Sequence, residues 1–238
     1  MSVIAGLHPV LEALRAGRPL ERVVVSTGAG GPRIQEIVDL CRKSGIAVRF
    51  EDRAALDRMA RGTPHQGVAG VAGEQRYASI EDVLNGAKLI VVLDGIEDPH
   101  NLGAIARTAH AAGADAIVIP ERRAASVTPV VEKAAAGALA YLPVVRAGNV
   151  NRALEKCKES GFWVYGLDAS GKADYDTVAY NTPTVIVAGG EGTGLHEQVK
   201  KHCDGLVRIP LAGSIASLNV SVATGIALFE WKRRYGTL

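Results

Sequence analysis

The chain has 238 residues, of which 47% are hydrophobic and 22% are charged, and its formal net charge is +2. This composition is that of a globular protein, and the length suffices for one large domain or for a small and a medium one. No apolar run approaches the roughly 20 residues that span a bilayer, and the N-terminus lacks the basic-then-apolar pattern of a signal peptide.

Cysteine and histidine usage argues against disulfides and metal sites. Cys41, Cys157 and Cys203 are far apart and form no CxxC pair, so we expect the protein to be cytoplasmic, in a reducing environment. The six histidines show no ligand spacing such as HExxH, so we expect no bound metal.

The charges are distributed unevenly along the chain. Residues 1–76 hold 11 Lys/Arg and 8 Asp/Glu, a net charge of +3, while the remaining residues hold 16 and 17, a net charge of −1. Ten of the eleven N-terminal cations are arginines, whose planar fork suits phosphate and base contacts. This bias is weak support for nucleic-acid binding by the N-terminal part.

Residues 1–73 are predicted to form a small α/β domain with its own core. Apolar periodicity predicts helices over residues 3–17, 34–44 and 53–61, and short apolar runs predict strands over 22–26, 46–50 and 67–72. Gly17 and Gly45 serve as stop signals for the first two helices.

Residues 74–88 are predicted to be a linker with a short helix, because Ser79 and Asp82 have the spacing of a capping box. Residues 89–238 alternate between strand and helix patterns, which predicts an α/β domain with a mainly parallel sheet. The expected strands cover 89–93, 116–119, 142–145, 162–167, 184–188 and 206–209. The expected helices cover 102–112, 129–140, 150–160, 196–202 and 218–234, with Thr128 and Asn149 as caps of the second and third.

Ligands of such sheets bind beyond the C-terminal ends of the strands, so the residues that follow Leu93, Ala188 and Ile209 are the candidates. After Leu93, Asn101 is placed to cap the next helix, and Arg107 lies inside an otherwise small, apolar helix. Arg107 alone is as compatible with an ion pair as with a ligand contact.

After Ala188 comes the glycine-rich run GGEGTGL. A dinucleotide-binding turn belongs near the start of its fold and needs an acidic residue about 20 positions on, and a P-loop needs a following Gly-Lys-Ser/Thr, so both are excluded. The glycines still indicate a tight turn with free N–H groups, in which Glu191 is either a solvated loop residue or a site carboxylate.

The third strand end, residues 208–223, joins the last strand to the terminal helix. Ser217 and Asn219 stand where that helix begins, so either can cap it or face a ligand. No catalytic triad, glycosidase-type carboxylate pair or metal cluster competes with these three segments in the sequence.

These segments resemble, in order and spacing, the three motifs of the TrmH-type SPOUT RNA 2′-O-ribose methyltransferases: DPHNLGAIARTAHAAG, VIVAGGEGTGL and RIPLAGSIASLNVSVATGIALFEW. The front of the chain also resembles the RNA-binding domain of the RlmB-like branch: IAGLHPVLEALRAGRPLERVVVS and HQGVAG. The resemblance covers nearly the whole chain.

The resemblance implies a trefoil-knotted catalytic domain, S-adenosyl-L-methionine as methyl donor, and a homodimer with the site near the interface. It also implies a ribosomal-protein-type N-terminal domain that presents RNA. RlmB-like members methylate a guanosine ribose of large-subunit (23S) ribosomal RNA, and we expect the same reaction here.

The resemblance further implies eight functional positions. Those of the three motifs are Asn101, Arg107, Glu191, Ser217 and Asn219, and those whose backbone would hold the donor are Gly189, Ile209 and Leu218. Within the family the counterpart of Arg107 is commonly proposed as the base. A guanidinium with a pKa above about 12 is a poor proton acceptor, so we favour an electrostatic role at the 2′-oxygen.

Two other functions are compatible with the sequence. One is a tRNA ribose methyltransferase, against which the extra N-terminal domain favours ribosomal RNA. The other is a non-catalytic RNA-binding protein with a vestigial donor pocket, against which the retained motif residues argue.

Overall fold

The computed structural model describes residues 3–15, 17–72, 77–214 and 217–236. The chain divides into two compact units, Met1–Arg76 and Tyr77–Leu238, which are described separately. In the described part of the chain, no helix combines the length and the apolarity needed to cross a membrane.

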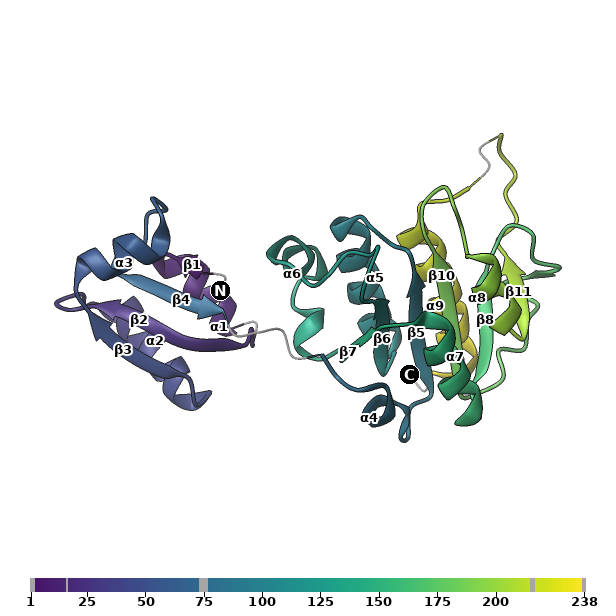
Figure 1. Ribbon diagram of the computed structural model, residues 1–238, viewed down its shortest axis with the longest axis horizontal. Helices are drawn as coiled ribbons and strands as arrows, with labels where there is room; N and C mark the ends of the chain where they lie inside the picture. The colour runs from purple at the N-terminus through teal and green to yellow at the C-terminus, as the bar shows by residue number, and fades with distance from the viewer. Residues whose placement is uncertain (1–2, 16, 73–76, 215–216, 237–238) are drawn as a thin grey trace. The chain divides into compact units, whose positions relative to one another are not determined.

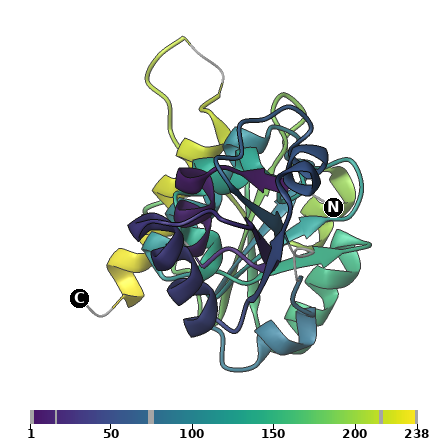
Figure 2. The ribbon, with the colours of Figure 1, turned by 90° about the vertical axis from the view of Figure 1, so that its left-hand side faces the viewer.

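The first unit is a four-stranded sheet with the order β1-β4-β2-β3, in which only β2 and β3 are parallel. Its elements are β1 (Val3–Ala5), α1 (Leu7–Arg15), β2 (Leu20–Ser26), α2 (Pro32–Lys43), β3 (Ala47–Glu51), α3 (Arg53–Ala60) and β4 (Val68–Ala72). Helices α1 and α2 cover one face of the sheet and α3 lies on the other (Figure 2).

The predicted helix over residues 3–17 is wrong at its start. Val3–Ala5 form β1, which pairs antiparallel with β4, and the helix begins only at Leu7. Gly6 between them has φ 109°, a left-handed conformation that ends the strand and that side chains rarely adopt. Val3 and Ile4 thus belong to an edge strand. Apolar periodicity over so few residues does not distinguish such a strand from the first turn of a helix.

The second unit is a seven-stranded sheet with the order β7-β6-β5-β10-β8-β11-β9, and every neighbouring pair is parallel. The strands are β5 (Leu89–Asp94), β6 (Ala116–Pro120), β7 (Val144–Ala147), β8 (Trp163–Leu167), β9 (Ala173–Asp174), β10 (Thr184–Gly189) and β11 (Gly205–Arg208). The helices are α4 (Ile80–Leu84), α5 (Pro99–Ala112), α6 (Pro129–Ala135), the 3-10 turn η1 (Ala138–Ala140), α7 (Val150–Glu159), α8 (Glu197–His202) and α9 (Val220–Tyr235).

Helices cover both faces of this sheet, giving three layers (Figure 1). The alternating residues of β5 show the arrangement: Leu89, Val91 and Leu93 pack with α5, α6 and α9, while Ile90 and Val92 pack with α4, α7 and α8. Burying each such aliphatic side chain contributes roughly 1.5–3 kcal/mol to the free energy of unfolding. The apolar strands therefore supply much of the stability of the core. The expected α/β class with a mainly parallel sheet is confirmed.

Three of the predicted caps are present, but several element boundaries differ from the prediction. Ser79, Thr128 and Asn149 each accept a hydrogen bond from the backbone N–H three residues on. The helix expected over 129–140 instead ends at Ala135, because Ala136 and Gly137 both adopt positive φ and start the 3-10 turn. The loop after β8 also contains a two-residue strand, β9, that the sequence pattern does not reveal.

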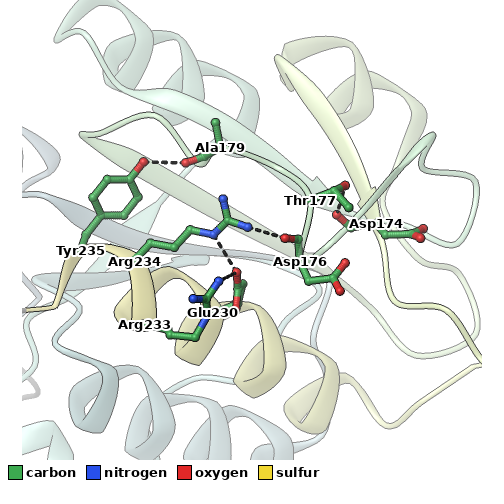
Figure 3. A network of polar contacts seen from close by, with 8 residues as sticks. All are labelled: Asp174, Asp176, Thr177, Ala179, Glu230, Arg233, Arg234 and Tyr235. Carbon is green, nitrogen blue, oxygen red and sulfur yellow. Dashed lines mark hydrogen bonds and ion pairs between the residues drawn. The ribbon is translucent and has the colours of Figure 1, made fainter.

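A polar network holds the C-terminal end of α9 (Figure 3). The buried carboxylate of Glu230 accepts two hydrogen bonds from Arg233 and one from Arg234, at 2.6–2.8 Å. Arg234 also donates to the Asp176 carbonyl, and Tyr235 donates to the Ala179 carbonyl. The helix is thereby fastened to the loop that precedes β10.

The Glu230 network predicts a pH-dependent contribution to stability. Hydrogen bonds from Arg233 and then Arg234 outweigh partial burial and lower the pKa of Glu230 to about 2. A carboxyl whose pKa is lowered by folding stabilises the protein above its unfolded pKa, and this contribution is lost as the pH falls towards 2. Glu230→Gln is therefore expected to cost about 2 kcal/mol of unfolding free energy at pH 7 and progressively less below pH ~4.5.

Urea unfolding of the wild type and Glu230→Gln between pH 3 and pH 7 measures this difference. The control is Glu159→Gln, because Glu159 is exposed and has no side-chain partner among the described residues. A difference between wild type and Glu230→Gln that stays constant over this range would contradict the assignment.

Candidate functional site

The strand ends that follow β10 and β11 meet at one edge of the second sheet. Strand β8 lies between β10 and β11, and since all three are parallel their carboxyl ends are adjacent. A cavity of about 680 Å³ opens there, within the range of small-molecule sites. Six of the eight predicted positions line it: Gly189, Glu191, Ile209, Ser217, Leu218 and Asn219.

A chain of side-chain hydrogen bonds joins the three predicted segments. The buried amide of Asn101, on α5, donates from Nδ2 to the Glu191 carboxylate of the glycine turn. Its Oδ1 accepts from Nδ2 of Asn219, at the start of α9, at 3.0 Å. One amide thus connects residues that are 90 and 118 positions away in the sequence.

The start of α5 differs from the prediction. The helix begins at Pro99 and its cap is Asp98, whose Oδ1 accepts from the His100 N–H at 2.8 Å. That backbone bond, followed by one from the Asn101 amide, lowers the pKa of Asp98. Asn101 is therefore not the cap, and its amide is free for the contacts with Glu191 and Asn219.

The terminal helix begins at Val220, and Asn219 is its cap. Asn219 Oδ1 accepts from the Ser221 N–H at 2.9 Å and from the Ser221 hydroxyl at 2.6 Å. Its two side-chain atoms have separate tasks, since Oδ1 caps the helix while Nδ2 holds Asn101. Ser217 is exposed at the cavity and has no hydrogen-bond partner among the described residues.

The glycine turn after β10 is fixed by close backbone packing. A Cβ at Gly189 would lie 2.2 Å from the carbonyl carbon of Gly194, so only glycine fits there. The turn is also tied to β5, because the buried carboxylate of Asp94 accepts from the backbone N–H and from Nδ1 of His196, at 2.8 and 2.9 Å. The sequence analysis does not identify Asp94, since its role depends on pairing between β5 and β10.

Arg107 lies apart from this network. It is exposed on α5, it does not line the cavity, and none of the described residues forms a hydrogen bond or ion pair with its side chain. The ion pair considered in the sequence analysis is thus absent among the described residues.

The cavity is also lined by two charged residues that were not predicted from the sequence. Asp168 follows β8, and Lys200 on α8 forms an ion pair with it at 3.1 Å. Asp168 directly follows the apolar run 162–167, so its place at a strand end is a signal for it in the sequence. Within the described ranges, no three His, Cys, Asp or Glu side chains cluster closely enough to hold a metal ion.

Two family models match the chain. The SpoU rRNA Methylase family matches residues 88–229, and the model for RNA 2′-O ribose methyltransferase substrate binding matches residues 3–78. The chain is 40% identical, over 97% of its length and 95% of the other protein, to the putative TrmH family tRNA/rRNA methyltransferase YacO of Bacillus subtilis. It is 43% identical, over 98% of its length and 76% of the other, to an uncharacterized tRNA/rRNA methyltransferase of Mycolicibacterium gilvum.

Among solved structures, the AdoMet-bound rRNA methyltransferase from Sinorhizobium meliloti aligns with a TM-score of 0.78 and 30% identity, over 99% of this chain and 88% of that one. The fold, the order of the strand-end motifs and both family matches agree with the resemblance found in the sequence. The chain therefore belongs to the SpoU rRNA methylase family, with an N-terminal segment of the matching substrate-binding family.

Proposed function

We propose that the protein transfers a methyl group from S-adenosyl-L-methionine to the ribose 2′-hydroxyl of a guanosine in 23S ribosomal RNA. The observation that carries this proposal is the hydrogen-bonded chain Glu191–Asn101–Asn219 beside a cavity of about 680 Å³. It unites the three motif segments at the sheet edge where α/β proteins bind nucleotides.

The size and lining of the cavity suit the methyl donor. Leu211 and Leu218 line it with partly exposed apolar side chains, which suit an adenine ring. Gly189 and Ile209 bring backbone groups to its wall, and with Leu218 they are the residues we assign to donor binding. When bound, S-adenosylmethionine would supply a methyl group on a positively charged sulfur, which leaves as a neutral thioether once the methyl group is transferred.

The chain's own residues would position the ribose, and the 2′-hydroxyl proton would pass to solvent as the oxygen–methyl bond forms and the methyl–sulfur bond breaks. We assign to Arg107 the electrostatic stabilisation of the developing 2′-alkoxide, because a guanidinium remains protonated at neutral pH. Glu191 and Asn101 hold the glycine turn against α5, while Asn219 and Ser217 order the segment that borders the donor cavity.

We further propose a trefoil-knotted, homodimeric catalytic domain in which Arg107 acts in the site of a second copy. Arg107 supports this proposal, because its side chain is exposed and has no partner among the described residues of its own chain. It is therefore available to a site on a second copy. Val222 and Phe229, exposed by 51% and 48%, are two helical turns apart on α9 and offer an apolar contact face.

We assign RNA binding to residues 1–73 and catalysis to residues 89–238; of the predicted linker 74–88, the part from Tyr77 onward, including α4, belongs to the second compact unit. The N-terminal unit pairs Arg15, Arg22 and Arg42 with acidic neighbours. Its exposed arginines without any partner among the described residues are Arg33, Arg49, Arg53, Arg58 and Arg61. Four of these fall within 49–61, along β3, α3 and the turn that follows, and they supply cations for phosphate contacts.

Mapping ribose methylation in total RNA, from cells with and without the gene, tests the substrate. We expect one 23S guanosine to lose its methyl group without the gene and to regain it with the wild-type copy. Loss at a tRNA position instead would establish the tRNA alternative. An unchanged methylation map would favour the non-catalytic alternative.

Arg107→Ala is expected to keep the fold and to lower kcat by about 10²-fold or more, the scale of losing one preorganised donor to a developing oxyanion. Arg107→Lys should retain part of the activity with an unchanged pH profile if the role is electrostatic. A profile that shifts with the lysine pKa would assign the proton-acceptor role to this residue instead. Methylation of an RNA substrate under single-turnover conditions measures both variants.

Mixing two inactive variants tests the dimeric site. Arg107→Ala and Glu191→Ala homodimers, denatured and refolded together, are expected to regain about a quarter of wild-type activity. Half of the random products are heterodimers, and each has one site with an intact Glu191 facing the partner subunit's intact Arg107. An inactive mixture that nevertheless contains heterodimers would show that Arg107 acts within its own chain.

The two tasks of Asn219 can be separated by substitution. Asn219→Ala removes the cap of α9 and should cost about 1 kcal/mol of unfolding free energy, while Asn219→Ser keeps a capping oxygen and should cost a few tenths. Both variants lose the Nδ2 donor to Asn101, so both should lose methylation activity to a similar degree. Wild-type activity in Asn219→Ser would show that the bond to Asn101 is dispensable.

A further inference from the structure

The cavity contains an ion pair that the methyl-transfer chemistry does not use. Asp168 stands at the carboxyl end of β8, between the strand ends that carry Gly189 and Ile209, and Lys200 approaches it from α8. Lys200 Nζ lies 3.1 Å from Asp168 Oδ2, and the side chains of Lys200 and Asp168 are only 23% and 10% exposed.

The Asp168 carboxylate is held in its ionised form. Its Oδ1 accepts from the backbone N–H and the hydroxyl of Ser170, at 2.9 and 2.6 Å. Burial opposes ionisation, but these bonds and the one from Lys200 outweigh it and lower the pKa of Asp168. At neutral pH the group is therefore a pure acceptor, and a carboxylate has about four acceptor positions.

A partly buried ion pair contributes little to folding, because the cost of removing two charges from water offsets their attraction. The pair lies beside the glycine turn, since a Cβ built at Gly194 would be 3.7 Å from Asp168 Oδ2. An acceptor in a small-molecule cavity, next to the segments assigned to the donor, is accordingly placed to bind part of that donor.

We infer that Asp168, oriented by Lys200, accepts a hydrogen bond at Oδ2 from a hydroxyl of the donor's ribose, because Ser170 occupies Oδ1 and Lys200 leaves one acceptor position on Oδ2. This inference rests on the proposed use of S-adenosylmethionine. The donor has two kinds of group that a carboxylate can bind, the ribose hydroxyls and the α-ammonium. Lys200 already neutralises Asp168 and would repel a second cation at this distance, whereas neutral hydroxyls meet no such repulsion. Carboxylates at strand ends bind ribose hydroxyls in this way in other α/β nucleotide sites.

Calorimetry with three ligands tests the assignment. S-adenosylhomocysteine has both the ribose hydroxyls and the amino-acid end, its 2′,3′-dideoxy analogue lacks the hydroxyls, and methylthioadenosine lacks the amino-acid end. The proteins are the wild type, Asp168→Asn, Lys200→Met and the control Lys201→Met, in which an exposed neighbour on the same helix is changed.

Asp168→Asn is expected to weaken S-adenosylhomocysteine and methylthioadenosine equally, by about 10- to 100-fold, the range for a hydrogen bond to a charged group. The dideoxy analogue should bind the wild type and Asp168→Asn with similar, weak affinity. Lys200→Met should reduce the preference for the hydroxyl-bearing ligand, and Lys201→Met should bind all three ligands as the wild type does. The preference of one variant for the hydroxyl-bearing over the dideoxy ligand does not depend on the folded fraction, so partial unfolding does not obscure the result.

Two outcomes overturn the inference while leaving the donor site intact. If Asp168→Asn weakens S-adenosylhomocysteine but not methylthioadenosine, the carboxylate binds the amino-acid end. If it binds every ligand as the wild type does, Asp168 does not contact the donor. Failure of the wild type to bind S-adenosylhomocysteine would instead overturn both this inference and the proposed function.

Discussion

The amide of Asn101 is the interaction on which the site depends. It is buried, and it connects Glu191 of the glycine turn with Asn219 at the start of the last helix. A buried amide with unsatisfied atoms costs roughly 1–3 kcal/mol, so these partners stabilise one arrangement of α5, the turn and α9. The geometry of the cavity follows from that arrangement, because the turn and the helix start form much of its wall.

Much of the fold could be predicted because its signals are local. Wholly apolar runs such as residues 89–93 identify a sheet covered on both faces, and Thr128 and Asn149 mark helix starts by their own hydrogen bonds. One error occurs where a partner distant in sequence decides the outcome. Val3–Ala5 become a strand only because β4 pairs with them.

The same distinction applies to the site. The strand ends and the family resemblance together predicted six residues that line one cavity, but only the strand ends at Leu93, Ala188 and Ile209 were considered, so Asp168 after β8 was missed. Capping was also assigned to Asn101, since the sequence alone does not decide between Asp98 and Asn101 as the cap. Arg107 is exposed on α5 and lies outside the cavity, and the residue pattern of the helix does not reveal this separation from the other motif residues.

The order of the second sheet also has a consequence for how the protein is made. Strand β10 lies between β5 and β8, so the centre of the sheet stays open until residues 184–189 have left the ribosome. The four strands of the first unit, by contrast, are all available by residue 72. Such non-local pairing slows folding and leaves apolar edges exposed for longer, so the nascent second unit is the part of the chain most in need of chaperone protection during translation.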